Sequence, residues 1–368
     1  MTHASLAVAT PARAATAPPR RAITRHTPPV VPALLRSYGS AARDAAEAYL
    51  VRPRPAAYLD DLVADYPRRG GKMMRPALCI AAARACGATL DEALPAAAAI
   101  ELFHNALLIH DDIEDGSEIR RGGPALHVTH GIPLAVNAGD ALLLLALQPL
   151  FDTAARIGGS AGSAILAATR TMARETVEGQ ALELGWREAN RTDLTPPDYL
   201  TMVLKKTAWL AIIWPIQLGI AVAMRGRGAP VHPDGVVRFG FFLGAAFQIQ
   251  DDLLNLVADA AYGKEWGGDL YEAKRTLLLI HVLDKASATD RATIDRFLAL
   301  DRAARTPAMA AEIGDLMEAY GAVAYARSVA LALAGAAAHE FDAAFGHLPP
   351  SPDKDFIAGL IPWVFERT

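Results

Sequence analysis

The chain has 368 residues, of which 52% are hydrophobic and only 7% aromatic, so its apolar content is mostly Ala, Leu, Val and Ile. Ala and Leu are strong helix formers, and this composition therefore favours a helical protein. A net charge of −4 argues against a general nucleic-acid-binding protein, which would usually be basic.

Residues 1–31 are rich in Ala, Pro, Thr and Arg, and the first acidic residue is Asp44. Such a segment buries too little apolar surface to offset its ordering entropy, so we predict a disordered tail followed by one domain over residues 32–368. A transit peptide has a similar composition, but the proline density argues against its amphipathic helix. These residues also lack the continuous apolar core of a signal peptide, and we expect a cytoplasmic protein.

The rest of the chain reads as successive helices. A helix ends before Gly70, and Pro76 lies in the first turn of the next one, which continues to Gly87. Asp91 is the expected N-cap of a helix over residues 92–112. Glycine and proline predict loops at residues 122–124, 131–133 and 263–268, and the further helices are expected at 137–155 with a kink near Pro149, 163–184, 197–224, 236–257 and from Leu277 onward.

No stretch alternates polar and apolar residues for long enough to predict a sheet. The best candidate for a membrane span, residues 208–224, contains Pro215 and Gln217, so a buried core helix is expected and no stable membrane insertion. Cys79 and Cys86 are seven residues apart in an Ala-rich helix, too far for a disulfide, and are predicted to be buried thiols.

Two acidic clusters carry the strongest functional signal. In the first, Asp111 and Asp115 are four residues apart and share one helix face, while Asp112 is rotated by ~100°. The second places Asp251 four residues before Asn255. Each cluster follows an apolar helical stretch, so both are expected at the mouth of one cavity. Carboxylates that repel one another at this spacing are stabilised by a divalent cation, and Mg²⁺ also leaves room for substrate phosphates.

Basic residues lie near glycines or acids in four separate regions. Arginine forks and lysine point charges both suit phosphate oxygens, and neighbouring glycines let the backbone approach a phosphate closely. The chain has no Walker loop, dinucleotide fingerprint, zinc spacing or hydrolase elbow. The basic groups are Lys72 and Arg75, Arg120 and Arg121, Lys205 and Lys206, and Lys264, Lys274 and Arg275.

These motifs strongly resemble those of the trans-isoprenyl diphosphate synthases, in order and spacing, from about residue 32 to 350. The resemblance implies an all-α fold, a single large helical bundle around a deep central cavity (the isoprenoid synthase type I fold), usually as a homodimer. It implies a Mg²⁺-dependent prenyltransferase that joins isopentenyl diphosphate to an allylic diphosphate. The matching segments are residues 70–76, 108–115, 120–122, 206–207, 247–252, 263–264 and 268–270.

The resemblance also implies roles for particular residues. Asp111 and Asp115 would bind two Mg²⁺ ions, and Asp251 a third with support from Asp252, giving about three ions per site. Thr207 would contact the leaving group. The allylic diphosphate would be held by Arg120, Lys206, Gln248 and Lys264, and isopentenyl diphosphate by Lys72, Arg75, His104 and Arg121. We also count Lys274 among the substrate-binding residues.

Two positions depart from the family pattern. Asn255 replaces an aspartate at the end of the second motif, which puts direct metal binding there in doubt, although some geranylgeranyl-type members carry the same residue. Met73 and Met74 stand in place of more usual Lys/Arg and Leu residues.

The residues before the first motif are expected to set product length, because they line the tunnel of the growing prenyl tail. A large aromatic side chain at Ala106 or Leu107 would block the tunnel early. Ala106 is small, so a tail longer than C15 should pass, and Phe103, about one turn deeper, could form the floor. We therefore expect mainly a C20 product, geranylgeranyl diphosphate, although ordinary helix packing would also explain both residues.

Two other functions stay open at this point. A terpene cyclase of the same fold would also ionise a prenyl diphosphate, but it has no use for the isopentenyl diphosphate group of Lys72, Arg75, His104 and Arg121. A non-catalytic subunit typically loses one aspartate motif, whereas both are present here.

Overall fold

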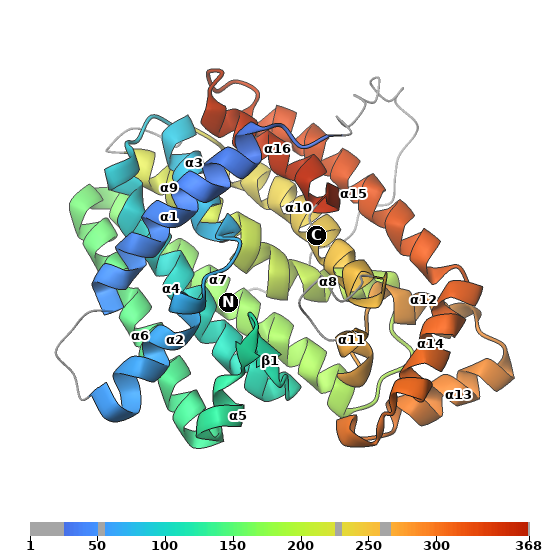
Figure 1. Ribbon diagram of the computed structural model, residues 1–368. Helices are drawn as coiled ribbons and strands as arrows, with labels where there is room; N and C mark the ends of the chain where they lie inside the picture. The colour runs from blue at the N-terminus through green and yellow to red at the C-terminus, as the bar shows by residue number, and fades with distance from the viewer. Residues whose placement is uncertain (1–25, 51–55, 225–229, 258–265, 367–368) are drawn as a thin grey trace, which may run out of the picture.

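The structure, a computed structural model, describes residues 26–50, 56–224, 230–257 and 266–366. The described residues form the expected all-α bundle, in which α4, α7 and α10 run through the middle (Figure 1). Most of the predicted tail lies outside the described residues. The first helix begins at Val30, two residues before the predicted domain, and Val31 is fully buried.

The first half of the chain supplies one wall of the bundle. α4 packs against α3 and α6, and α3 also packs against α9. The elements are α1 (Val30–Leu50), the π-helix η1 (Ala56–Asp60), α2 (Asp61–Arg69), α3 (Met74–Ala85), α4 (Leu90–Asp115), β1 (Ile119–Arg120), β2 (Gly123–Pro124), α5 (Leu126–His130), α6 (Ile132–Ile157) and α7 (Gly159–Glu188).

The second half adds the opposite wall, in which α10 lies along α15, and a smaller group of helices α12–α14 at one end of the molecule (Figure 1). The elements are α8 (Pro196–Val203), the π-helix η2 (Leu204–Ile213), α9 (Trp214–Met224), α10 (Pro233–Val257), α11 (Gly268–Tyr271), α12 (Leu277–Lys285), α13 (Ala288–Leu298), the 3₁₀-helix η4 (Arg302–Ala304), α14 (Pro307–Ala319), α15 (Ala322–Phe345) and α16 (Pro352–Glu366).

Several predicted boundaries were wrong for identifiable reasons. The N-cap of α4 is Thr89 rather than Asp91, because Thr89 and Glu92 form a reciprocal capping box. Residues 132–133 are not a loop but the start of α6, since Pro133 fits the first turn of a helix. α6 continues through Pro149 to Ile157.

Two further expectations need correction. A two-residue antiparallel hairpin, β1–β2, pairs Ile119 with Pro124, where no strand was expected. Cys79 is buried as predicted, whereas Cys86 is only partly buried, and both are free thiols.

Four described helical segments are long and apolar enough to cross a membrane by length and composition. Two of them, α4 and the continuous segment from α8 to α9, have most of their apolar window buried in the bundle. These two segments carry the first acidic cluster and Lys206, so they form the interior wall of the site described next.

Candidate active site

Each acidic cluster contributes residues to the lining of one pocket, which has a volume of about 170 Å³. Asp111 comes from the last turns of α4, and Asp251 and Asn255 come from the last turns of α10. Lys206 and Thr207 enter from η2, which lies between α7 and α10. π-Helical turns are rare and occur frequently at functional sites. Three elements far apart in the sequence therefore meet at a single polar cavity.

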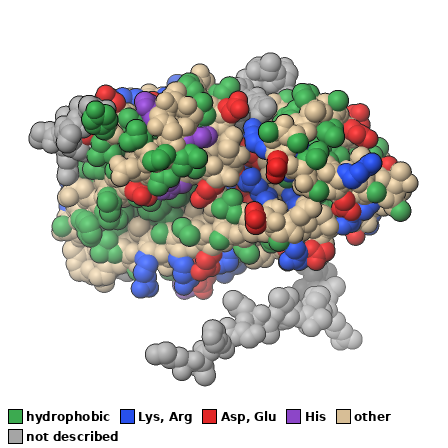
Figure 2. All heavy atoms as spheres, turned by 90° about the horizontal axis from the view of Figure 1, so that it is seen from below, with side chains coloured by type: hydrophobic (Ala, Val, Ile, Leu, Met, Phe, Trp, Pro, Cys, Tyr) green, Lys and Arg blue, Asp and Glu red, His purple; other side chains and the backbone are tan. Residues whose placement is uncertain are grey.

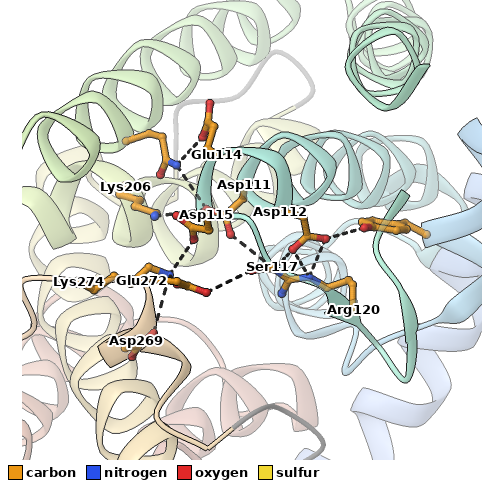
Figure 3. A network of polar contacts seen from close by, with 12 residues as sticks. Asp111, Asp112, Glu114, Asp115, Ser117, Arg120, Lys206, Asp269, Glu272 and Lys274 are labelled. Carbon is orange, nitrogen blue, oxygen red and sulfur yellow. Dashed lines mark hydrogen bonds and ion pairs between the residues drawn. The ribbon is translucent and has the colours of Figure 1, made fainter. Parts of the chain in front are cut away.

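Asp111 is surrounded by cationic and amide groups. Its Oδ1 lies 3.4 Å from Nζ of Lys206, and its Oδ2 lies 3.7 Å from Nη2 of Arg120. Gln180 on α7 reaches the same carboxylate at 3.5 Å and also donates to Glu114 (Figure 3). Asp111 thus faces the pocket with positive charge beside it.

Asp112 is adjacent in sequence but points into the core, where it is fully buried. Arg120 grips it through Nε and Nη2, and the hydroxyl of Tyr66 donates to Oδ2 at 2.6 Å. Burial raises the pKa of Asp112, and the hydrogen bonds from Arg120 and Tyr66 counteract part of that rise. Asp112 therefore holds Arg120 in place and does not itself line the pocket.

Asp115 lies one turn after Asp111 and is held by two cations. Arg187 donates to its Oδ1 at 2.5 Å, and Lys274 lies 2.9 Å from its Oδ2. Burial would raise the pKa of Asp115, but Lys274, Lys206 and Arg187 hold it well below its usual range. Asp115 is not among the residues that line the pocket, so its predicted metal contact would require exchange of these partners.

Lys206 and Lys274 are the central cations of the site. Lys206 pairs with Glu183 at 2.8 Å. Lys274 pairs with Glu272 at 2.6 Å and lies 3.8 Å from Asp269 (Figure 3). Burial opposes their charged forms, but the surrounding carboxylates raise the pKa of both lysines above the usual range. Both side chains are therefore charged at neutral pH.

The second cluster is tied to Thr207 by a chain of hydrogen bonds. The Thr207 hydroxyl donates to Gln248 Oε1 at 2.8 Å, and Gln248 Nε2 donates to Asp252 at 2.8 Å. Tyr199 donates to the other Asp252 oxygen at 2.7 Å. Burial, reinforced by Asp269, raises the pKa of Asp252 to about 8. Asp252 is buried, and both Asp251 and Asp252 belong to the lining of the pocket.

Asn255 accepts a hydrogen bond from the backbone N–H of Asp269 at 3.0 Å. This bond ties the end of α10 to α11, which gives the unusual amide a structural use. Lys264 lies outside the described residues.

The predicted isopentenyl diphosphate residues gather around the Gly70–Gly71 turn. Arg121 donates to Tyr66 O at 2.8 Å and to Asn105 Oδ1 at 2.9 Å, and a Cβ added at Gly71 would lie only 3.0 Å from Arg121 Nη2. His104 is partly buried, and burial together with Arg75 and Arg121 holds its pKa well below its usual range. Lys72 is exposed at the surface of the same turn.

The predicted tunnel residues lie on α4, on the core side of Asp111. Ala106 is fully buried, Leu107 is partly buried and Phe103 keeps 8% of its surface accessible. Phe103 packs edge-to-face on Trp214 of α9.

The sequence reasoning did not assign several residues of this network. Glu183 and Arg187 come from α7, Tyr199 from α8, and Asp269 and Glu272 from the segment after α10. Asp269 lies within a segment that matched the family pattern, so this signal could have identified it. The others have no local motif, because their relation to the clusters exists only in the folded chain.

The donor set fits hydrated Mg²⁺. Among the described residues, no three His, Cys, Asp or Glu side chains are close enough to form a metal cage. Mg²⁺ usually binds through one or two carboxylates and keeps waters and substrate phosphates as its other ligands. Asp111 and Asp251 on two walls of one pocket provide such an open arrangement.

An all-α bundle with this pocket defines a prenyltransferase that acts on isoprenoid diphosphates. The chain matches the polyprenyl synthetase family over residues 56–315 and belongs to that family. It is 37% identical over 300 residues to the short chain isoprenyl diphosphate synthase of Methanothermobacter thermautotrophicus, covering 81% of this chain and 87% of that protein. It is 31% identical to the geranylgeranyl pyrophosphate synthase of Geoglobus acetivorans, covering 82% and 88%.

A solved structure shows the same arrangement of helices. The geranylgeranyl pyrophosphate synthase of Corynebacterium glutamicum, complexed with isoprenyl diphosphate and magnesium, matches with a TM-score of 0.80 and 26% identity, over 91% of this chain and 99% of that one.

Proposed function

We propose that the protein condenses isopentenyl diphosphate with an allylic diphosphate and releases mainly the C20 product, geranylgeranyl diphosphate. The observation that carries this proposal is the meeting of Asp111 and Asp251 with Lys206 in one pocket. The names of the similar proteins, which include several geranylgeranyl diphosphate synthases, support the chain length.

Asp111, Asp115 and Asp251 would hold Mg²⁺, about three ions per site by analogy with the family. When bound, these ions supply positive charge that neutralises the diphosphate and stabilises it as a leaving group. The protein contributes Lys206 and Arg120 beside Asp111, where they can bind the same phosphate oxygens.

Thr207 and Gln248 orient the leaving group, since both line the pocket and share a hydrogen bond. The isopentenyl diphosphate would bind at the Gly70–Gly71 turn, where Arg75, His104 and Arg121 lie close together. The apolar helices below the pocket exclude water that would otherwise trap the allylic cation.

We further propose that the enzyme is a cytoplasmic homodimer without stable membrane insertion. The two free thiols are consistent with a reducing compartment. An apolar stripe on α6 supports a second copy as partner: Val136, Leu144, Leu147 and Phe151 are each 37–69% exposed and follow helical spacing. The face that Figure 2 presents gathers hydrophobic side chains at the end of the molecule where α5 and α6 lie in Figure 1.

The decisive experiment supplies farnesyl diphosphate, labelled isopentenyl diphosphate and Mg²⁺. Label in a longer prenyl diphosphate is the expected result. In Asp111→Ala, turnover should fall by at least about 10²–10³-fold, because charge stabilisation of the leaving group is lost. Circular dichroism should show an unchanged fold.

Asp284→Ala serves as the matched control, because that carboxylate is 70% exposed on α12, away from the pocket. Near-normal turnover of folded Asp111→Ala would contradict the metal assignment. An unlabelled hydrocarbon product would indicate a cyclase, and no turnover of the wild-type protein would indicate a non-catalytic subunit.

A further inference from the structure

Two helical segments meet twice, first at the polar site and again deeper in the bundle. At the site, Asp111 Oδ1 of α4 lies 3.4 Å from Lys206 Nζ of η2. Phe103 lies eight residues before Asp111, and Trp214 lies eight residues after Lys206. The rings of Phe103 and Trp214 are in contact, with centroids 5.5 Å apart and planes inclined by 63°. Eight residues of the α-helix α4 span ~12 Å, so the ring contact lies about that far from Asp111 along α4.

The two rings differ in their exposure. Phe103 keeps 8% of its surface accessible, whereas Trp214 has none. Phe103 therefore keeps a small accessible surface, whereas Trp214 is enclosed in the core. If a growing prenyl tail pressed against Phe103, the Phe103 ring could move toward Trp214 only if the indole also moved.

A hydrogen-bond chain fixes the indole. Trp214 Nε1 donates to the hydroxyl of Thr169 at 3.0 Å, and that hydroxyl donates to the carbonyl of Ile165 at 2.9 Å. Thr169 and Ile165 belong to α7, which packs against α9. The indole is thus anchored to a third helix, and rotation would leave a buried N–H without its partner.

We propose that Trp214, anchored by Thr169, is a positioning residue that sets product length by preventing Phe103 from retreating. This inference rests on the proposed prenyl-chain elongation. Each condensation adds four bonds to the main chain of the tail, and the tail stops growing when its end meets a ring that cannot move. A smaller residue at 214 would leave space behind Phe103 and allow further additions.

The test compares product lengths made from farnesyl diphosphate with excess labelled isopentenyl diphosphate. For Trp214→Leu we expect the ratio of C25 and longer products to C20 to rise by about tenfold or more, the discrimination that one or two buried groups provide. Thr169→Val should raise that ratio less, because the indole keeps its volume but loses its anchor. Ala106→Phe, on the same wall nearer the site, should instead shorten the product to C15.

The matched control is Phe356→Leu, a fully buried aromatic in α16 of the same core cluster. It should lower thermal stability without changing product length. If Phe356→Leu also made longer products, the proposal would be overturned, because a general loss of core stability would then explain the longer products. An unchanged product from folded, active Trp214→Leu would also overturn it.

If Trp214→Leu does not fold, Thr169→Val and Trp214→Phe carry the test, and C20 alone from both would overturn the proposal. A wild-type protein that elongates nothing would instead refute the proposed function. The two failures are therefore distinguishable.

Discussion

Asp111 and Asp112 are adjacent in sequence but lie in different environments, because successive residues of a helix point in different directions. Asp111 faces the pocket, whereas Asp112 is buried against Tyr66 and Arg120. Asp112 binds Nε and Nη2 of Arg120, and the same Nη2 lies 3.7 Å from Asp111 Oδ2, so Arg120 bridges the two carboxylates. Breaking such a buried pair leaves an uncompensated charge, so we expect Asp112 to act by positioning Arg120.

The thiol of Cys86 provides a pH-dependent test at the residue scale. Burial raises its pKa from 9.0 to about 11. Because the thiolate is the nucleophile, alkylation by iodoacetamide at pH 8 should be about 100-fold slower in the folded protein than in urea. The rate in the folded state should rise with a midpoint near pH 11. Cys79→Ala removes the other thiol from the measurement.

The same rise in the pKa of Cys86 makes the free energy of unfolding depend on pH. The folded state favours the neutral thiol, so this contribution is fully present below about pH 9 and is lost as pH rises through about 11. An alkylation midpoint near 9 in the folded protein would refute the burial argument.

Individual residue roles were only partly predictable. The i, i+4 spacing placed Asp111 on one face and Asp112 on another, as the structure shows. Spacing could not reveal that Arg187 and Lys274 hold Asp115, because these cations are 72 and 159 residues further along the chain.

At the scale of elements, the π-helix η2 is packed tightly between α7 and α10 through two glycines. A Cβ added at Gly179 would lie 2.3 Å from the backbone nitrogen of Lys206, and one at Gly244 would lie 2.7 Å from the Ala208 Cβ. The absence of these side chains lets η2 bring Lys206 close to Asp111.

Gly179→Ala should therefore push η2 away from α7. We expect a loss of about 1–3 kcal/mol in the free energy of unfolding, measured by urea denaturation, because the backbone must shift. Turnover should fall as well, since Lys206 moves with η2.

Gly185→Ala is the matched control on the same helix, where nothing lies within 4 Å of the added Cβ. It should raise helix stability by roughly 0.5–1 kcal/mol and leave turnover unchanged. Equal effects of the two substitutions would exclude the packing explanation.

Helix positions were predicted well and their ends less well. α4, α10 and α12 lie close to their predicted positions, but the reciprocal cap at Thr89 replaced the expected cap at Asp91. Nothing in the local sequence distinguishes the π-helical turns of η2 from an α-helix.

For the whole molecule, the apolar stripe on α6 predicts association of two copies. Leu144→Lys combined with Phe151→Lys should weaken the dimer by at least about tenfold in Kd, because two exposed anchors of the stripe become charged. Size-exclusion chromatography with light scattering would measure the shift from dimer to monomer.

Leu331→Lys is the control, because Leu331 is 53% exposed on α15 rather than on α6. It should leave the dimer intact. A wild-type protein that is monomeric at all concentrations tested would contradict the assignment of this face.

The all-α architecture was predictable because composition, periodicity and the family motifs agreed. The shape of the polar network was not, since it depends on how α7 and the segment after α10 fold over the two clusters.

The length of η2 has a consequence for how such an enzyme can change. The segment carries Lys206 near its start and leads directly into Trp214. Deleting one residue between them would rotate everything beyond the deletion around the helix axis and shorten the π-helical segment. The Lys206–Asp111 ion pair and the Phe103–Trp214 ring contact could not then both be kept. Because residues 208 and 211–213 are also buried in the bundle, both the number and the size of the side chains along this segment are constrained.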